Sequence, residues 1–438
     1  MRNNNTSPLG RSGGAFTKAV RLYGREDLRL EEFELPVIRE DEILAKVVSD
    51  SICMSSYKAA KQGIAHKRVP DNAAENPPII GHEFAGEILE VGAKWQHKFK
   101  PGQKFSIQPA IYYEDGPVGI LSAPGYSYPY IGGDATYVII PKDVLEQDCL
   151  LAYDGPGYYP ASLAEPLSCV IGAMHANYHT KPGSYIHQME IKDGGKMAIL
   201  AGVGPMGLAA INYVINRKGR KPSLLVVTDI SQERLDRAAT IFPPRLAKKK
   251  GIELVYLNTG KVADPVSALK SLADGEGYDD VFVFAPVAPV IEQGDAILAS
   301  DGCLNFFAGP SNPEFSAKMN FYNVHYASTH IVGTSGGNND DMVEALQCLS
   351  EGLDPAGLVT HIGGLNAVID TTLNLPNIPG GKKLIYTHID LPLTAIDDFD
   401  KLGKENPMFF ELAKRVAKTK GLWNVEAEEY LLENAPQI

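Results

Sequence analysis

The feature that most constrains the fold of this sequence is the glycine-rich string GVGPMG at residues 202–207, which directly follows a short apolar run. It has the pattern G-x-G-x-x-G, and the residues after it predict a helix. Gly202 permits a tight turn, Gly204 lets the backbone approach a pyrophosphate, and Gly207 lets helix and strand pack closely. In this setting the string predicts a dinucleotide-binding turn with phosphate at the helix N-terminus. The alternative is a glycine-rich turn without a ligand.

The next strand-like run, LLVVTD, ends in Asp229. A carboxylate there accepts hydrogen bonds from both ribose hydroxyls and repels a 2′-phosphate, so NAD(H) is favoured although NADP(H) is not excluded. A helix-capping aspartate is the alternative. The predicted cofactor-binding residues are Gly202, Gly204, Pro205, Met206, Gly207 and Asp229.

Two patterns divide the chain. From about residue 19 to 144, short β-type runs are separated by Gly and Pro, which indicates a β-rich, barrel-like domain. After residue 164, strands and helices alternate, which predicts a doubly wound parallel sheet and places the protein in the α/β class. We expect a flexible arm at 1–18, a β-rich domain at 19–170, a dinucleotide-binding domain at 171–340, and a segment at 341–438 that returns to the first domain.

Composition limits the partners. The chain has 438 residues and a net charge of −12 at pH 7, so nucleic acid and anionic membranes would repel it at long range. A small-molecule substrate is favoured. The five cysteines are scattered without paired spacing, which indicates reduced thiols, and the sequence has no secretory or membrane-spanning apolar run. We therefore expect a cytoplasmic protein.

Four residues that are far apart in sequence have settings typical of a site. Cys53 follows an extended apolar run, His82 and Glu83 lie in GHEFAG at the mouth of another strand, and Glu165 lies where a helix is expected to open, with Pro166 in the first helical position. No spacing rule alone groups them.

The strings SDSICMSS, GHEFAGEILEVG, PGQKF, GGDATYVIIP, AEPLSCVIGA and AGVGPMGLAAI occur in the order of the landmarks of zinc-containing medium-chain dehydrogenases. The chain resembles this superfamily from about residue 19 to at least 350, and within it the sorbitol dehydrogenase branch. SDSICMSS, PGYSYPYIGGDATY and PGGKKLIYTHI are also similar to the L-sorbose-1-phosphate reductase group. The resemblance implies a GroES-like catalytic domain, a Rossmann domain, one catalytic Zn²⁺ per chain, and a homodimer or homotetramer.

By this resemblance Cys53 and His82 are zinc ligands and Glu83 is the third, while Glu165 either orients a metal-bound water or joins the ligands. Zinc takes thiolate, imidazole and carboxylate in a tetrahedron, and a catalytic site leaves one position open. Cys169, four residues after Glu165 on the same expected helix, is a rival ligand, whose alternative is a packed core thiol.

Ser55 matches the family position whose hydroxyl touches the substrate oxygen, which implies the first step of a proton relay. Where relatives often carry a histidine that passes the proton on, this chain has Lys58, which is either a relay, a partner for an anionic substrate group, or a solvated lysine. The run His66-Lys67-Arg68 is either a phosphate-binding patch or a charged loop, and the pair Lys382-Lys383 offers a similar alternative.

The region that carries a structural zinc in many relatives, about residues 105–133, contains no cysteine here, so we expect no second zinc. It carries Tyr112, Tyr113, Tyr126, Tyr128 and Tyr130 instead, which indicates a loop that packs internally, or at a subunit contact or the mouth of the site. We expect His175, His179, His325 and His361 to be structural.

The sequence thus predicts a zinc-dependent oxidoreductase that transfers a hydride between a nicotinamide cofactor and a polyol or ketose, including sugar phosphates of the L-sorbose 1-phosphate/glucitol 6-phosphate type. One alternative is a zinc-free reductase of activated double bonds on the same fold. Another is a catalytically inert dinucleotide-binding protein.

Overall fold

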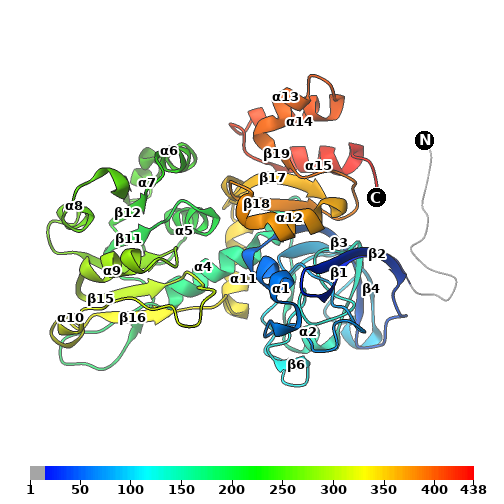
Figure 1. Ribbon diagram of the computed structural model, residues 1–438, viewed down its shortest axis with the longest axis horizontal. Helices are drawn as coiled ribbons and strands as arrows, with labels where there is room; N and C mark the ends of the chain where they lie inside the picture. Colours follow the sequence, from blue (N-terminus) through cyan, green and yellow to red (C-terminus); the bar gives the residue numbers. More distant parts are fainter. Residues whose placement is uncertain (1–14) are drawn as a thin grey trace. The chain divides into compact units, whose positions relative to one another are not determined.

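The structure is a computed structural model that describes residues 15–438; most of the expected arm, residues 1–14, lies outside them. The described chain forms two compact units (Figure 1). Unit 1 comprises residues 15–165 and 354–438, and unit 2 comprises residues 166–353. None of the helices in the described range is long and apolar enough to span a membrane.

The unit boundaries differ from the expected domain boundaries at 170/171 and 340/341. Helix α11 (Asn339–Ser350) belongs to unit 2, because His175 Nδ1 lies 2.8 Å from Asp341 Oδ1 and so ties α11 to α4 (Ala164–Ala176). At the other end, β1 already begins at Phe16, inside the expected arm, where Thr17 donates a hydrogen bond of 2.8 Å to the Tyr137 carbonyl.

Unit 1 is built on a mixed sheet in the order β19-β17-β18-β3-β4-β5-β8, with β7 also paired to β3 and a separate β1–β2 hairpin. Its strands are β1 (Phe16–Gly24), β2 (Asp27–Glu34), β3 (Ile43–Ile52), β4 (Phe84–Val91), β5 (Lys104–Ile107), β6 (Pro117–Ile120), β7 (Tyr137–Ile140), β8 (Leu150–Ala152), β17 (Val359–Gly364), β18 (Lys382–Tyr386) and β19 (Thr394–Ala395). Its helices are α1 (Met54–Gln62), α2 (Lys142–Glu146), α3 (Tyr159–Ser162), α12 (Val368–Asn374), α13 (Phe399–Leu402), α14 (Pro407–Ala417) and α15 (Val425–Asn434).

The C-terminal helices complete unit 1. They cover β17 and β18 with a core that contains Trp423, Tyr386 and Phe399, all nearly inaccessible to solvent. Glu428 of α15 is buried and accepts hydrogen bonds from the backbone N–H groups of Tyr158 and Tyr159 and from the Tyr386 hydroxyl, at 2.7, 2.8 and 2.9 Å. The last helix therefore fixes the start of α3, the segment that leads to Glu165.

Unit 2 is a parallel sheet in the order β13-β12-β11-β14-β15-β16, the 3-2-1-4-5-6 order of a doubly wound dinucleotide-binding sheet. Its strands are β9 (Tyr178–His179), β10 (Gln188–Met189), β11 (Lys196–Leu200), β12 (Leu224–Asp229), β13 (Glu253–Asn258), β14 (Tyr278–Val283), β15 (Leu298–Phe306) and β16 (His330–Gly333). Its helices, besides α4 and α11, are α5 (Pro205–Asn216), α6 (Gln232–Ile241), α7 (Pro244–Lys249), α8 (Pro265–Leu272), α9 (Ala288–Ala296) and α10 (Phe321–Tyr326).

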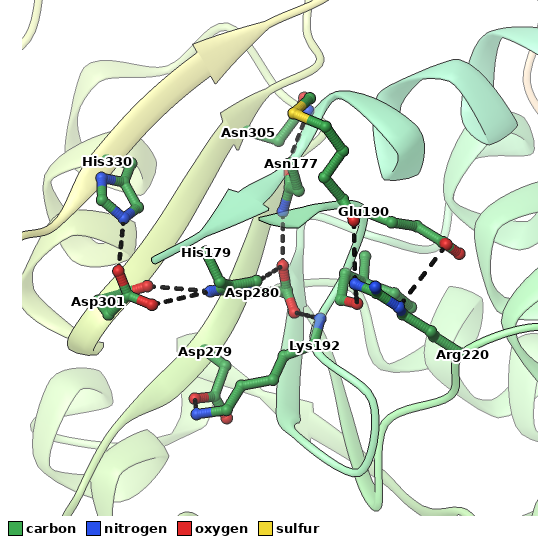
Figure 2. Close-up of polar contacts among 12 residues, drawn as sticks. Asn177, His179, Glu190, Lys192, Arg220, Asp279, Asp280, Asp301, Asn305 and His330 are labelled. Atoms are coloured by element: carbon green, nitrogen blue, oxygen red, sulfur yellow. Dashed lines mark hydrogen bonds and ion pairs between the residues drawn. The ribbon is translucent and has the colours of Figure 1, made fainter. Parts of the chain in front are cut away.

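A polar edge network, formed by Asn177, His179, Asp280, Asp301 and His330, joins the β9–β10 hairpin to the sheet of unit 2 (Figure 2). Asp280 Oδ1 accepts hydrogen bonds from Asn177 Nδ2 at 2.7 Å and contacts His179 Nε2 at 3.2 Å. The other oxygen, Oδ2, accepts the backbone N–H of Lys192 at 2.9 Å. These residues explain the structural role that we expected for His179.

Candidate active site

Strand pairing brings three of the expected ligands together. Strands β3 and β4 are antiparallel, with Asp50 opposite Phe84, so the end of β3 lies beside the start of β4. Cys53 follows β3 and forms the N-cap of α1, while His82 and Glu83 immediately precede β4. One ligand atom from each of these three residues lies within 4.8 Å of the other two.

A lysine from the far end of the sequence completes this cluster. Strand β18 pairs with the other edge of β3, with Lys383 opposite Ile52, which puts Lys382 beside Glu83. Lys382 Nζ donates to both carboxylate oxygens of Glu83, and the Ser51 hydroxyl donates to one of them. Both members of the ion pair are buried, at 5% and 1% side-chain exposure, so the pair is shielded from bulk water.

His82 is held from both ring nitrogens. Ser56 Oγ lies 3.2 Å from Nδ1, and the Tyr126 hydroxyl lies 3.2 Å from Nε2. Tyr126 also makes a side-chain hydrogen bond with Ser55. Burial lowers the pKa of His82 to about 4, so the imidazole is neutral at physiological pH, the form in which histidine binds a metal.

Cys53 and Glu165 share this environment. Burial, with the neighbouring charge of Glu83, raises the pKa of Cys53 to about 12, and Glu165 adds to the rise. Glu165 is 9% exposed and lies in the first turn of α4, which begins at Ala164 rather than at Pro166. Because a bound cation favours thiolate, the acidity of Cys53 depends on what the site holds.

A second pair of carboxyl groups lies behind Glu83. Asp50 Oδ1 accepts the backbone N–H of Glu83 at 3.0 Å, and the Asp50 carboxyl interacts with that of Asp134. Gly81 and Gly133 pack so closely on Asp50 that a Cβ atom on either would lie 2.5 Å from its side chain. Burial raises the pKa of Asp134 to about 7, so near neutral pH the two groups can share one proton. We call Asp50, Glu83, Asp134 and Lys382 the Glu83 cluster.

The glycine-rich turn of unit 2 has the predicted form. It connects β11 to α5, with Gly204 as N-cap. A Cβ atom on Gly207 would lie 2.2 Å from the Gly202 carbonyl, which explains the small residue there. Asp229 ends β12 and is 7% exposed; one of its oxygens accepts the Ser231 N–H at 2.9 Å and the other lies 4.0 Å from Arg234.

The chain matches known families along most of its length. A family described as alcohol dehydrogenase GroES-like domain matches residues 39–147, and one described as zinc-binding dehydrogenase matches residues 205–351. The chain is 54% identical to mannitol-1-phosphate 5-dehydrogenase of Aliivibrio fischeri over 418 residues, 95% of this chain and 97% of the relative. It is 51% identical to L-sorbose 1-phosphate reductase of Klebsiella pneumoniae over 423 residues, 96% of this chain and 98% of the relative.

The chain belongs to the zinc-binding medium-chain dehydrogenases. It is an oxidoreductase of the alcohol and polyol dehydrogenase type, similar to sorbitol dehydrogenase. The solved structure of 2R,3R-butanediol dehydrogenase from Bacillus subtilis matches with a TM-score of 0.66 at 22% identity, covering 84% of this chain and 99% of that one. This likeness confirms the predicted fold, a GroES-like domain with a Rossmann domain.

The other residues that we expected at the site of this dehydrogenase, Ser55, Lys58 and Cys169, lie on helices α1 and α4. Ser55 lies in the first turn of α1, 3.7 Å from Cys53 Sγ, and Lys58 lies one turn later. Cys169 lies in α4 and is not part of the three-ligand group found among the described residues. The absence of a second zinc stays a prediction.

The basic pair at the start of β18 does not form a phosphate patch. Lys382 pairs with Glu83, and Lys383 donates to the carbonyls of Ile378, Pro379 and Gly381 at 3.3, 3.0 and 2.7 Å. Both cations are therefore engaged inside the protein.

The sequence did not indicate that Lys382, Asp50 and Asp134 belong to the site, and it did not indicate the contact of Tyr126 with His82. Tyr126 was expected only as part of a tyrosine-rich loop, with the mouth of the site as one of its alternatives, and its hydroxyl contacts His82. A Pro-Gly-Tyr string carries no chemical signal of its own. Only the pairing of β18 with β3 reveals that Lys382 neutralises Glu83.

Proposed function

We propose that this dehydrogenase interconverts a polyol phosphate and a ketose phosphate with NAD(H), and that Cys53, His82 and Glu83 hold one zinc ion. The observation that carries the proposal is the convergence of a thiol, an imidazole and a carboxylate within 4.8 Å in a buried site. Two of the relatives that are more than half identical are named mannitol-1-phosphate 5-dehydrogenase and L-sorbose 1-phosphate reductase, and these names support the substrate class.

The donor set fits zinc. One thiolate, one imidazole and one carboxylate leave the fourth tetrahedral position open, as in catalytic zinc sites. Lys382 and Ser51 hold the Glu83 carboxylate in place, which is the usual role of groups behind a metal ligand. When bound, zinc polarises the substrate oxygen and lowers the pKa of the alcohol. Glu165 lies near enough to Cys53 and Lys382 to orient a water or substrate hydroxyl, or to act as a further ligand.

The residues of the chain supply binding and proton transfer. The Ser55 hydroxyl, hydrogen-bonded to Tyr126, takes the proton from the substrate oxygen during oxidation and returns it during reduction. Lys58 lies one turn further along α1. In unit 2, the backbone N–H groups of Met206, Gly207 and the other turn glycines bind the pyrophosphate at the start of α5, which Pro205 opens, and Asp229 binds the adenosine ribose.

The decisive experiment is elemental analysis of purified protein beside Cys53→Ser and His82→Ala variants. We expect about one zinc per chain in the wild type and loss of zinc and turnover in both variants. Zinc-free wild-type protein that still reduces activated double bonds would favour the alternative reductase. A folded, zinc-loaded protein without turnover on polyol or ketose phosphates would favour the inert protein.

Cofactor choice has its own test. Asp229→Ala should raise the KM for NAD, because the carboxylate that binds the ribose hydroxyls is gone. It should also lower the ratio of kcat/KM with NAD to kcat/KM with NADP, because nothing then repels the 2′-phosphate. Equal losses with both cofactors would contradict the role assigned to Asp229.

We further propose that the protein is a homodimer formed along β16. This strand is the outer strand of the unit 2 sheet, so one row of its backbone N–H and C=O groups has no neighbouring strand in the described residues. Ile331 on β16 is 49% exposed, and Phe321 and Tyr322 of α10 are 75% and 68% exposed. Light scattering of the purified protein tests this, since Ile331→Lys should shift a dimer to monomers.

A further inference from the structure

A basic cluster, formed by Lys58, His66, Lys67 and Arg68, lies one aromatic ring away from His82. The His66 ring stacks on the Tyr126 ring with a centroid distance of 5.8 Å, and Arg68 Cζ lies 5.9 Å from the same centroid. The Tyr126 and His82 ring centroids are 4.8 Å apart. The cluster is therefore a neighbour of the proposed reaction centre within unit 1.

Two cations of this cluster, Lys67 and Arg68, are not paired with an acidic side chain in the part of the chain that the structure describes. Neither Lys67 nor Arg68 has a carboxylate within ion-pair distance among residues 15–438, although the chain carries a net charge of −12. Burial and the three cations Arg68, Lys67 and Lys58 lower the pKa of His66 to about 4, with no acidic residue acting in the opposite direction. Like charges held together without a counter-charge destabilise the protein, unless an anion joins them.

The guanidinium of Arg68 is positioned rather than loose. Its Nη1 donates to the Leu121 carbonyl at 2.9 Å, and its own carbonyl accepts the Ser127 hydroxyl at 2.6 Å. The tyrosine-rich loop thus holds Arg68 from two sides. Among the described residues, the guanidinium hydrogen bond to Leu121 uses one of its five N–H groups, and the remaining N–H groups suit the oxygens of a phosphate.

We propose that Arg68, together with Lys58 and Lys67, forms the subsite that binds the phosphate group of the substrate. This inference rests on the proposed function and adds which residues distinguish a phosphorylated substrate from the free polyol. The neutral His66 ring, packed on Tyr126, forms the floor of the subsite. The pair Lys382-Lys383, which the sequence offered as an alternative phosphate site, is engaged by Glu83 and by backbone carbonyls.

The test compares phosphorylated and free substrates. In the zinc-loaded enzyme, Arg68→Gln should raise the KM for mannitol 1-phosphate about 10- to 100-fold, the loss expected for charge-assisted hydrogen bonds, with little change in kcat. Activity on free mannitol should stay within about twofold, because that substrate has no group for Arg68 to bind. Arg68→Lys should fall between the two, since it keeps the charge without the planar fork.

Lys61→Gln is the matched control. Lys61 lies on α1, as Lys58 does, but it pairs with Glu26 outside the basic cluster. The KM values for both substrates should therefore equal those of the wild type. Circular dichroism of each variant checks that it is folded. An equal loss on phosphorylated and free mannitol would overturn the proposal, because Arg68 would then act through Tyr126 rather than through phosphate. An unchanged KM for mannitol 1-phosphate would also overturn it.

A binding measurement separates this inference from the proposed function. Calorimetric titration of metal-free protein with mannitol 1-phosphate, inorganic phosphate and free mannitol needs no turnover. We expect mannitol 1-phosphate to bind more tightly than inorganic phosphate, and Arg68→Gln to weaken both. Wild-type binding that Arg68→Gln leaves unchanged would reject the subsite even if the enzyme oxidises polyol phosphates. Arg68-dependent phosphate binding without turnover would keep the subsite and reject the proposed reaction.

Discussion

The polar edge network of unit 2 and the Glu83 cluster of unit 1 both contain buried carboxyl groups, but the surroundings shift the pKa values of these groups in opposite directions. In the network, Asp301 accepts hydrogen bonds from the backbone N–H and hydroxyl of Thr180 and contacts His330 Nε2 at 2.9 Å. Although burial alone would raise it, these contacts hold the pKa of Asp301 below its ordinary value. Such carboxylates stabilise the fold.

In the Glu83 cluster, three acidic groups face a single lysine. Burial and the charges of Asp134 and Glu83 raise the pKa of Asp50 well above its ordinary value. Asp50 Oδ2 and Asp134 Oδ1 are buried and have no donor among the described residues. Apolar side chains could fill the same space without loss of stability, so these buried carboxyl groups are not needed to hold the fold. Buried carboxyl groups with shifted pKa values are typical of functional sites. The comparison separates charges that hold the fold from charges that surround the proposed metal site.

Removing the counter-ion of the Glu83 cluster should have the largest effect. Lys382→Met leaves the Glu83 carboxylate buried without its cation, and we expect the free energy of unfolding to fall by about 3–5 kcal/mol. Urea unfolding of metal-free protein measures this. The double variant Glu83→Gln/Lys382→Met should recover much of the loss. A single-variant loss below about 1 kcal/mol would mean that the pair is far better solvated than its burial indicates.

Removing a charge from the polar edge network should cost less. In Asp280→Asn, the amide NH₂ group would face Asn177 Nδ2 or the Lys192 N–H, each of which donates to the carboxylate in the wild type. We expect the free energy of unfolding to fall by about 1.5–3 kcal/mol, with the zinc content unchanged. Asp274→Asn is the control, since Asp274 is 86% exposed and should change stability little. Loss of zinc in Asp280→Asn would contradict this prediction, because it would show that the polar edge network affects metal binding in unit 1.

The same type of substitution in the Glu83 cluster should have the opposite sign. Because the pKa of Asp134 is raised from 3.8 to about 7, its favourable contribution is complete below 3.8 and is lost as the pH rises through 7. Asp134→Asn keeps a donor for Asp50 without ionising, so we expect stability at pH 8 to rise by about 1 kcal/mol. Unfolding curves from pH 5 to 8 should be flatter for the variant. A uniform loss at every pH would contradict this.

Local patterns were enough to predict the dinucleotide turn, because strand, Gly202–Gly207 and helix are continuous in sequence and each glycine has a steric reason. The three expected ligands could be named only through the resemblance, and the β3–β4 pairing explains their meeting. The partner of Glu83 could not be predicted, since Lys382 is 299 residues away and its sequence setting resembles an ordinary strand. Tyr126 was also missed, because a loop conformation decides where its hydroxyl points.

The long separation between Glu83 and Lys382 has a consequence for biosynthesis. While the chain is being made, β3 can pair early with β4 and β7, but β18, which pairs with residues 49–52 of β3, emerges only after the whole of unit 2. During that interval the Glu83 carboxylate has no ammonium group beside it, and the last part of one edge of β3 is open to other chains. A nascent chain arrested before residue 382 should therefore depend on chaperones more than the finished protein does.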